Sequence, residues 1–292
     1  MEKVTYYVKR MFPEMLYPAY IRYKYWKKMG KKCNLLSPKT FTEKIQWAKL
    51  YRRNELLSTL SDKVQVRKWV ANKIGDSYLV PRIGDIYYRA DDIPFDQLPN
   101  EYVLKVNNGS GFNIIVDSNN QIDSDNVKKI LNKWLTFDFF YSSFEYQYKG
   151  IRSSVYIEEK IKGNSNGDLP DYKFFCFYGK VFCSYTRINT YEGHDKGKIG
   201  FFDRDYNLMP YYRADYEPIV EQLPKPRNYL QMVKIAEKLS EGFSHVRVDL
   251  YNIDGKIYFG EMTFSTFSGY CRFVPEEFDR ILGNQWDIHK GI

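Results

Sequence analysis

The chain has 292 residues, enough to bury a large core, and its 43% hydrophobic content is ordinary for a globular protein. Its formal net charge is +8, but residues 1–32 hold nine basic and two acidic side chains, so the basicity is an N-terminal feature. No stretch approaches the roughly 20 apolar residues of a membrane span and no signal peptide is visible, so we expect a cytoplasmic protein.

The basic residues of segment 1–32 are interleaved with eight tyrosine, phenylalanine and tryptophan side chains. This composition suits peripheral contact with anionic lipid at the inner membrane face, or with a polyanionic glycan. A helical arm packed on the body of the protein explains it equally well. We expect no nucleic-acid partner, because the rest of the chain has no basic stripe and no recognisable binding motif.

The first half of the chain alternates helical and strand patterns. Helices are predicted for residues 41–50 and 61–73, the second with Ser61 or Asp62 as its cap. Short strands are predicted for 78–80 and 83–87, a hairpin for 102–116 and a helix for 124–135.

Strands dominate the second half. Residues 155–161, 172–177, 180–187 and 200–203 are predicted to form an antiparallel sheet. Residues 228–241 have a helical apolar stripe, and a last hairpin joins 245–250 to 256–263. The whole pattern is α+β.

The last hairpin carries the most informative side chains. Alternation along a strand sends Arg247 and Asp249 to one face, and likewise Glu261 and Thr263. Carboxylate oxygens that are brought together by the hairpin suit Mg²⁺, which takes its other ligands from water and phosphate. The alternative is a pair of solvated carboxylates that form salt bridges with neighbouring cations.

The earlier hairpin has the pattern of a phosphate-covering loop. Lys105 lies on an apolar strand that runs into a glycine-bearing turn, residues 107–111, and then into a second strand. Backbone N–H groups of such a turn bind phosphate oxygens, and a lysine adds charge. It is neither a Walker loop nor a dinucleotide fingerprint. Alone, the turn is also a common structural hairpin.

Cysteines and histidines point to no metal or redox centre. The four cysteines show no Cys-x-x-Cys spacing, so we expect buried, reduced thiols. His245 begins a strand and is expected to be structural, and the sequence spells no catalytic triad.

The order of these motifs resembles the ATP-grasp enzymes. Segments 61–63, 103–105, 157–161, 171–174, 247–249 and 261–263 carry the resemblance. Segments 37–47 and 260–264 are similar to the TupA-like branch, associated with teichuronopeptide and capsular polysaccharide synthesis. The resemblance implies an ATP-grasp fold, with two α+β subdomains gripping ATP between antiparallel sheets. It implies a basic helical region at 1–60, a small subdomain with the phosphate loop at 61–154 and a subdomain with the magnesium site at 155–292.

The resemblance also implies a role for individual residues. ATP would be bound by Lys63, Lys105, Gly109, Ser110, Gly111, Glu158, Glu159, Ile161 and Asp171, with Glu158, Glu159 and Ile161 at adenine and Asp171 at ribose. Arg187, Arg247 and Lys173 would serve catalysis, and Asp249, Glu261 and Thr263 would ligate Mg²⁺. Many relatives have Asn where this chain has Thr263, which puts the geometry of a second metal in question.

The implied activity is an ATP-dependent carboxylate–amine ligase that works through an acyl phosphate. It would join an amino acid or another amine to a uronic acid of a cell-surface polysaccharide or its precursor. The polar segment 191–198, with Lys196 and Lys198, would close over the acceptor. The alternatives are a glycosyltransferase that uses a nucleotide sugar, for which Asp203-Arg-Asp205 is the one metal-type triplet, and a non-catalytic glycan- or membrane-binding protein.

Overall fold

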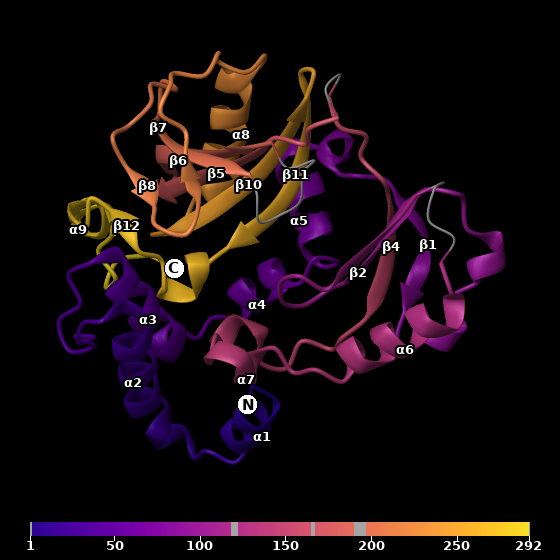
Figure 1. The fold of residues 1–292 in the computed structure, drawn as a ribbon, viewed down its shortest axis with the longest axis horizontal. Helices are drawn as coiled ribbons and strands as arrows, with labels where there is room; N and C mark the ends of the chain where they lie inside the picture. The colour runs from indigo at the N-terminus through magenta and orange to yellow at the C-terminus, as the bar shows by residue number, and fades with distance from the viewer. Residues whose placement is uncertain (1, 118–121, 165–166, 190–196, 292) are drawn as a thin grey trace.

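The computed structural model describes residues 2–117, 122–164, 167–189 and 197–291. These residues form a four-stranded and a six-stranded sheet, each covered by helices, together with a helical N-terminal region (Figure 1). In the view of Figure 1 the larger sheet lies at the upper left and the smaller sheet at the right. The predicted α+β pattern is therefore present.

Most of the N-terminal region is helical in the described residues. Its helices are α1 (Glu2–Arg10), α2 (Tyr17–Met29), α3 (Phe41–Tyr51) and α4 (Glu55–Ser61), followed by α5 (Val66–Ile74). Helix α3 begins with a capping box, in which Thr40 Oγ1 accepts the N–H of Glu43 and the Glu43 carboxylate accepts the N–H of Thr40. Buried Tyr17, Ile21 and Tyr25 place one side of α2 in a cluster with residues of and after α7 (Phe140–Ser143).

The start of the helix predicted for residues 61–73 is wrong, because residues 63–65 form a turn before α5, but Asp62, one of the two predicted caps, does cap this turn. The Asp62 carboxylate accepts the N–H groups of Val64 and Gln65 at 2.8 and 3.1 Å, as a capping residue does, and so starts a new helical turn. Lys63 therefore lies in a tight turn between α4 and α5. The strand predicted for 78–80 is also wrong, since these residues contain the end of a 3₁₀ turn, Asp76–Tyr78, and irregular chain.

The smaller sheet has the order β1-β4-β2-β3, and all its pairs are antiparallel. Its strands are β1 (Arg82–Tyr87), β2 (Tyr102–Val106), β3 (Asn113–Val116) and β4 (Val155–Glu159), and helix α6 (Ser124–Leu135) packs on it. The prediction that residues 155–161 join the later strands is wrong, because β4 pairs with β1 and β2. The first sheet thus extends past residue 154, while the division into regions at 60 and 154 stays a prediction.

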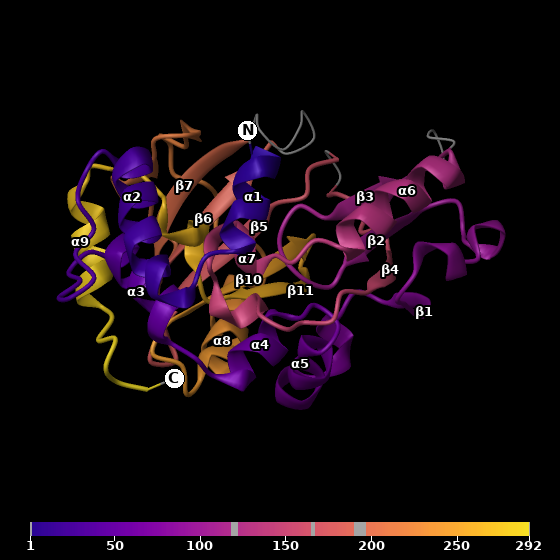
Figure 2. The same cartoon turned by 90° about the horizontal axis from the view of Figure 1, so that it is seen from below.

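The larger sheet has the order β11-β10-β5-β6-β7-β9, antiparallel except for the pair β7–β9. Its strands are β5 (Asp171–Phe177), β6 (Lys180–Ile188), β7 (Lys198–Asp203), β9 (Glu217–Pro218), β10 (Val246–Ile253) and β11 (Lys256–Thr263). Two short strands, β8 (Tyr212–Arg213) and β12 (Phe273–Val274), pair beside it. Helix α8 (Tyr229–Ser240) covers one face, and α3 and α9 (Glu277–Asn284) cover the other (Figure 2).

Strand alternation explains how this sheet supports two cores. Phe174 packs with the buried stripe of α8, whereas its neighbour Phe175 packs with α3 and α9 on the opposite face. Burying a side chain of this size contributes about 1.5–3 kcal/mol. The sheet is therefore held firmly from both sides, and its strands β10 and β11 offer a rigid base for polar side chains.

Candidate functional site

A polar cavity lies where the smaller sheet and its loop face strands β5, β6, β10 and β11 of the larger sheet. Ten of the sequence-predicted site residues line it: Lys63, Lys105, Ser110, Gly111, Glu158, Asp171, Lys173, Arg187, Asp249 and Glu261. Residues from the first half of the chain thus share one cavity with carboxylates that come almost 200 residues later. Arg247, Thr263 and Gly109 lie directly behind this lining, bonded to residues within it.

Asp249 and Glu261 are direct cross-strand neighbours on β10 and β11. Arg247 binds Asp249 in a bidentate pair, with both nitrogen–oxygen distances at 2.7 Å, and its Nη2 also donates to Glu261 Oε1 at 2.8 Å. Thr263 completes the group, because its hydroxyl donates to Glu261 Oε1 at 2.8 Å and accepts from Arg247 at 3.0 Å. Arg247 therefore holds the two carboxylates together.

Lys173 connects the hairpin to β5. Its ammonium donates to Asp249 Oδ2 at 2.7 Å and also forms an ion pair with Asp171. Burial lowers the pKa of Lys173, but Asp171 and Asp249 outweigh this and hold it well above the ordinary value. Lys173 is therefore a fixed positive charge rather than a base. Arg187 lies on the other side of Asp171, with its Nη2 at 3.7 Å from Oδ2.

The pKa of Glu261 is lowered to about 2. Burial raises it, but Arg247, Lys173 and Lys63 together favour the carboxylate more strongly. Because the pKa lies below its ordinary value of 4.5, the stabilisation from this carboxylate is present above pH 4.5 and is lost as the pH falls toward 2.

We expect the free energy of unfolding to fall more steeply between pH 4.5 and 2 in the wild type than in Glu261→Gln, which has no such carboxylate to protonate. Denaturant titrations at steps across this range measure the difference. Parallel pH profiles of the two proteins would contradict the assignment, while Glu241→Gln, which changes an exposed carboxylate paired with Lys73, should follow the wild type.

The donor set fits one magnesium ion. Asp249 and Glu261 supply hard carboxylate oxygens and Thr263 a hydroxyl, and Glu261 Oε2 accepts no hydrogen bond from any described residue. The described part of the chain contains no group of three or more acidic, histidine or cysteine side chains that could hold a metal. Two carboxylates suffice for Mg²⁺ when phosphate and water supply the remaining ligands.

Asn107 connects the turn that carries Lys63 to the glycine-bearing loop, residues 107–111, by hydrogen bonds. The Asn107 amide donates to Asp62 Oδ2 at 2.8 Å and to the carbonyl of Arg152 at 3.1 Å, and its Oδ1 accepts the N–H of Ser154 at 2.8 Å. Its backbone carbonyl accepts the N–H of Lys63 at 2.9 Å. The sequence analysis did not identify Asp62 or Asn107 as site residues. In the structure, the hydrogen bond between these two buried side chains positions Lys63 and the glycine-bearing loop.

The loop presents a row of backbone donors. The N–H groups of Asn108, Gly109, Ser110 and Gly111 donate to no group in the described residues, and the loop closes where Val106 N–H donates to the carbonyl of Phe112. Gly109 has φ +71°, and a Cβ there would lie 2.1 Å from the Phe139 ring, so only glycine fits. The ammonium group of Lys63 donates to the carbonyl of Gly109. Such a row of N–H groups suits an anion.

Glu158 is bound by two cations. Lys105 donates to its Oε2 at 2.6 Å and Arg67 to its Oε1 at 2.7 Å. Arg67, which also donates to the carbonyl of Val80, lines the cavity and was missed in the sequence. The sequence could have indicated Arg67, because it follows Lys63 by four residues in the predicted helix 61–73, and residues four apart lie on the same face of a helix.

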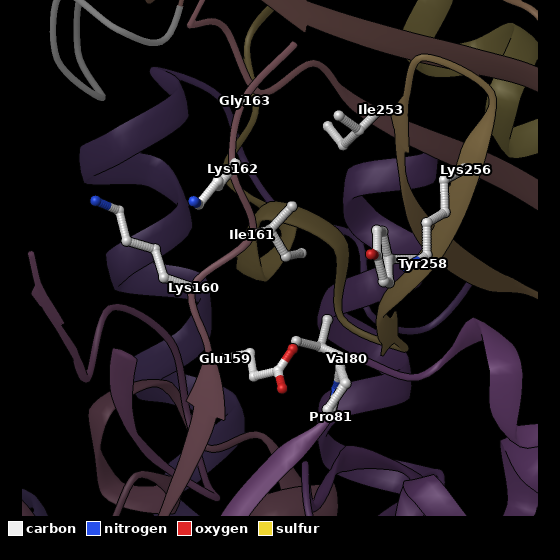
Figure 3. A pocket seen from close by; sticks show the side chains of 10 residues that line it. All are labelled: Val80, Pro81, Glu159, Lys160, Ile161, Lys162, Gly163, Ile253, Lys256 and Tyr258. Atoms are coloured by element: carbon white, nitrogen blue, oxygen red, sulfur yellow. The ribbon is translucent and has the colours of Figure 1, made fainter. Parts of the chain in front are cut away.

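A second cavity adjoins the first and holds the other predicted adenine contacts. Glu159 and Ile161 line it together with Val80, which borders both cavities, and Tyr258. Figure 3 shows the apolar side chains of Val80 and Ile161 facing this space and the ends of Lys160 and Lys162 pointing away from Tyr258. The N–H of Ile161 donates to no described residue, whereas the N–H of Glu159 donates to the carbonyl of Pro81.

Other residues considered in the sequence lie outside these cavities. His245 is buried with Nδ1 at 3.0 Å from the carbonyl of Cys176, and burial lowers its pKa to about 3, which confirms a structural role. All four cysteines are free and buried, as predicted. Asp203 accepts three bonds within its own turn, from Asp205 and Asn207. Of the segment 191–198, residues 191–196 lie outside the described residues, and Lys198 pairs with Glu217.

Comparison with known proteins gives one family. The model of the TupA-like ATPgrasp family matches residues 43–287. Among solved structures, a D-alanine–D-alanine ligase from Bacillus anthracis has 19% identity and a TM-score of 0.43 over 79% of this chain and 69% of its own. An L-amino acid ligase from Bacillus licheniformis has 13% identity and a TM-score of 0.44. The match covers 78% of this chain and 50% of the ligase. Among curated proteins none matches significantly.

Proposed function

The chain belongs to the TupA-like ATP-grasp family, and from this premise we propose that it joins an amine to a sugar carboxylate at the expense of ATP. Membership of the family confirms the predicted ATP-grasp fold and makes the chain an enzyme of the carboxylate–amine ligase class. The observation that supports the proposal most directly is the single cavity that contains both the phosphate-type loop and the two carboxylates of the last hairpin.

ATP would lie across the two adjoining cavities. Its phosphates would meet the free N–H groups of residues 108–111 and the ammonium groups of Lys63 and Lys105, while the adenine would reach the hinge at Glu159 and Ile161. Asp171 would accept a ribose hydroxyl, a role supported by its buried Oδ1, which has no hydrogen-bond partner among the described residues. Glu158 would orient Lys105 and Arg67 beside the nucleotide.

The chemistry follows from what a carboxylate requires. Its oxygen attacks the γ-phosphorus of ATP, the bond to ADP breaks, and an acyl phosphate forms; an amine then attacks the carbonyl carbon, phosphate leaves and an amide remains. The magnesium ion, when bound by Asp249, Glu261 and Thr263, neutralises charge on the phosphates. Arg247, Arg187 and Lys173 are fixed cations that stabilise the charge that develops on the transferred group.

The substrate carboxylate is proposed to belong to a uronic acid of a capsular or other cell-surface polysaccharide, or of its precursor. The amine is an amino acid or another primary amine. This assignment is supported by the match to the TupA-like family together with the association of that branch with teichuronopeptide and capsular polysaccharide synthesis. We further propose that the enzyme works in the cytoplasm, at the inner membrane face. No helix of the described residues could span a membrane.

Thermal unfolding separates the ligase from its alternatives. We expect Mg²⁺ and ATP to raise the Tm by several degrees, because a ligand at 100 times its Kd stabilises the folded state by about 2.7 kcal/mol. A nucleotide sugar should cause no shift. The reverse pattern would favour a glycosyltransferase, and no shift with either ligand would favour a non-catalytic binding protein.

The products define the reaction. The protein would be incubated with ATP, Mg²⁺, a panel of amines and several uronic-acid sugars, while ADP and new amide mass are measured together. We expect ADP to form in proportion to an amide whose mass equals that of the two substrates less one water. ADP without amide would remove the ligase proposal, and reactions that omit the sugar serve as the control.

A further inference from the structure

We propose that one side of the N-terminal region docks on an anionic lipid bilayer. This docking face consists of Tyr7, Met11, Met15, Leu16, Tyr23 and Trp26, with Arg22 and Lys27 beside it. The inference rests on the proposed location of the enzyme and adds the surface that would produce it. It does not depend on the identity of the reaction.

Helix α2 carries apolar side chains on two opposite sides. Tyr17, Ile21 and Tyr25 repeat at intervals of four and are buried against the body of the protein. Ala19, Tyr23 and Trp26, with Leu16 directly before the helix, also repeat at intervals of three or four, but they are exposed. A helix that is apolar on two sides needs a cover for both, and the described structure supplies a cover for only one.

The exposed apolar side chains are concentrated in this region. Half of the 14 large hydrophobic side chains that are exposed in the described residues lie between Tyr7 and Trp26. Met15 is 82% exposed, Met11 77%, Tyr7 63% and Trp26 57%. Scattered single apolar residues need no explanation, but a concentration in α1, α2 and the segment that joins them indicates an interaction surface.

The structure also sorts the basic residues of this segment into two groups. Lys9 and Lys24 donate to the carbonyl of Ser142, and Lys31 pairs with Glu276 at 2.5 Å, so these ammonium groups serve internal contacts. Arg22 and Lys27 are exposed and border the apolar stripe of α2. The sequence alone could not separate the cations that hold the arm from those that face outward.

Charge and side-chain type select lipid as the partner. Arg22 and Lys27 border this face, so two copies that meet there would bring like charges together, whereas anionic headgroups would attract it. Tyr and Trp are the residues that prefer the headgroup level of a bilayer, and Met and Leu insert below it. Helices α1 and α2 lie along one rim of the molecule in Figure 1, where a flat surface can reach them.

The test is co-sedimentation of the full chain with vesicles. We expect binding to phosphatidylcholine vesicles that contain phosphatidylglycerol, little binding to phosphatidylcholine alone, and weakening with salt. Replacing Arg22 and Lys27 by glutamine should weaken binding about fivefold for each charge removed. Replacing Tyr23 and Trp26 by serine should abolish it, while the rate of ATP turnover in solution stays unchanged.

The matched control changes Val220 and Leu230 to serine, two exposed apolar residues outside the arm, and should bind as the wild type does. Absence of vesicle binding by the wild type, or equal binding by the Tyr23 and Trp26 variant, would overturn the proposal. So would a dimer in solution that this variant dissociates, because the face would then be covered by a second copy. ATP turnover, measured separately, tests the ligase proposal and not the docking face.

Discussion

Replacing Asp249 by asparagine is expected to reduce the rate of ADP formation by a factor of about 100 to 1,000, the usual cost of losing one electrostatic contact to a transition state. The neutral amide keeps the shape of the side chain but leaves Arg247 and Lys173 without their shared anion. It also removes a proposed magnesium ligand. Steady-state measurement of ADP with saturating ATP, Mg²⁺ and both substrates gives the rate.

Because Asp249 belongs to a buried ion pair, the same change should lower stability by about 3–5 kcal/mol, and loss of activity could then reflect unfolding. Glu261→Gln is the milder change, since the Glu261 side chain is 38% exposed and solvent screens part of its interactions. It should lower stability less than Asp249→Asn does, and lose activity while the protein stays folded. Asp254→Asn is the matched control on the same hairpin, where the backbone has φ +51° and asparagine is well tolerated. A folded Asp249→Asn or Glu261→Gln protein with wild-type turnover would refute the assignment of the site.

Replacing Asn107 by alanine is expected to weaken both the fold and the binding of ATP. Its side chain makes three hydrogen bonds in a buried position, to Asp62, Arg152 and Ser154, and their loss should cost about 2–4 kcal/mol in the free energy of unfolding. The turn that holds Lys63 and the loop that follows residue 107 would lose their common anchor. Urea unfolding and the ATP concentration at half-maximal Tm shift measure the two effects.

Asn108→Ala provides the comparison at the next position. Asn108 is equally buried, but its side chain makes one hydrogen bond, to Ser153 Oγ at 3.0 Å, and its Oδ1 has no partner. This variant should lose about 1 kcal/mol or less. Equal losses in the two variants would show that burial of the loop, rather than the Asn107 bonds, joins it to Lys63.

Local pattern was sufficient for the elements that contain their own signal. The hairpin of Lys105, helix α6, helix α8 and the last hairpin have the ranges that turn residues and periodicity predict, to within a few residues. The pairing of Asp249 with Glu261 needs one further feature, because the register set by the turn would place Gly260 opposite Asp249, and a β-bulge between Asp249 and Leu250 moves the partner to Glu261. These features depend on neighbours in the chain.

The sequence-based predictions were wrong or incomplete where contacts between distant segments of the chain determine the structure. Strand β4 has the same apolar pattern as the strands that follow it, and only pairing with β1 and β2 assigns it to the smaller sheet. The turn at Asp62 is capped locally, but its position beside the glycine-bearing loop depends on the hydrogen bond from Asn107, 45 residues away. Arg67 became a site residue because Glu158 lies opposite it.

By itself, the sequence determined which functional groups are present. Lysines and a glycine-bearing turn lie early in the chain, and acidic residues with an arginine lie near its end, in an order typical of the ATP-grasp family. It also determined that the basic charge is concentrated in the first 32 residues. Only the tertiary structure decided that these groups share one cavity, which carboxylates are bound by Arg247 and Lys173, and which side of α2 faces outward. The physical reason is that residue type and periodicity act over a few residues, whereas the proximity of distant groups is selected by burial and strand pairing over the whole chain.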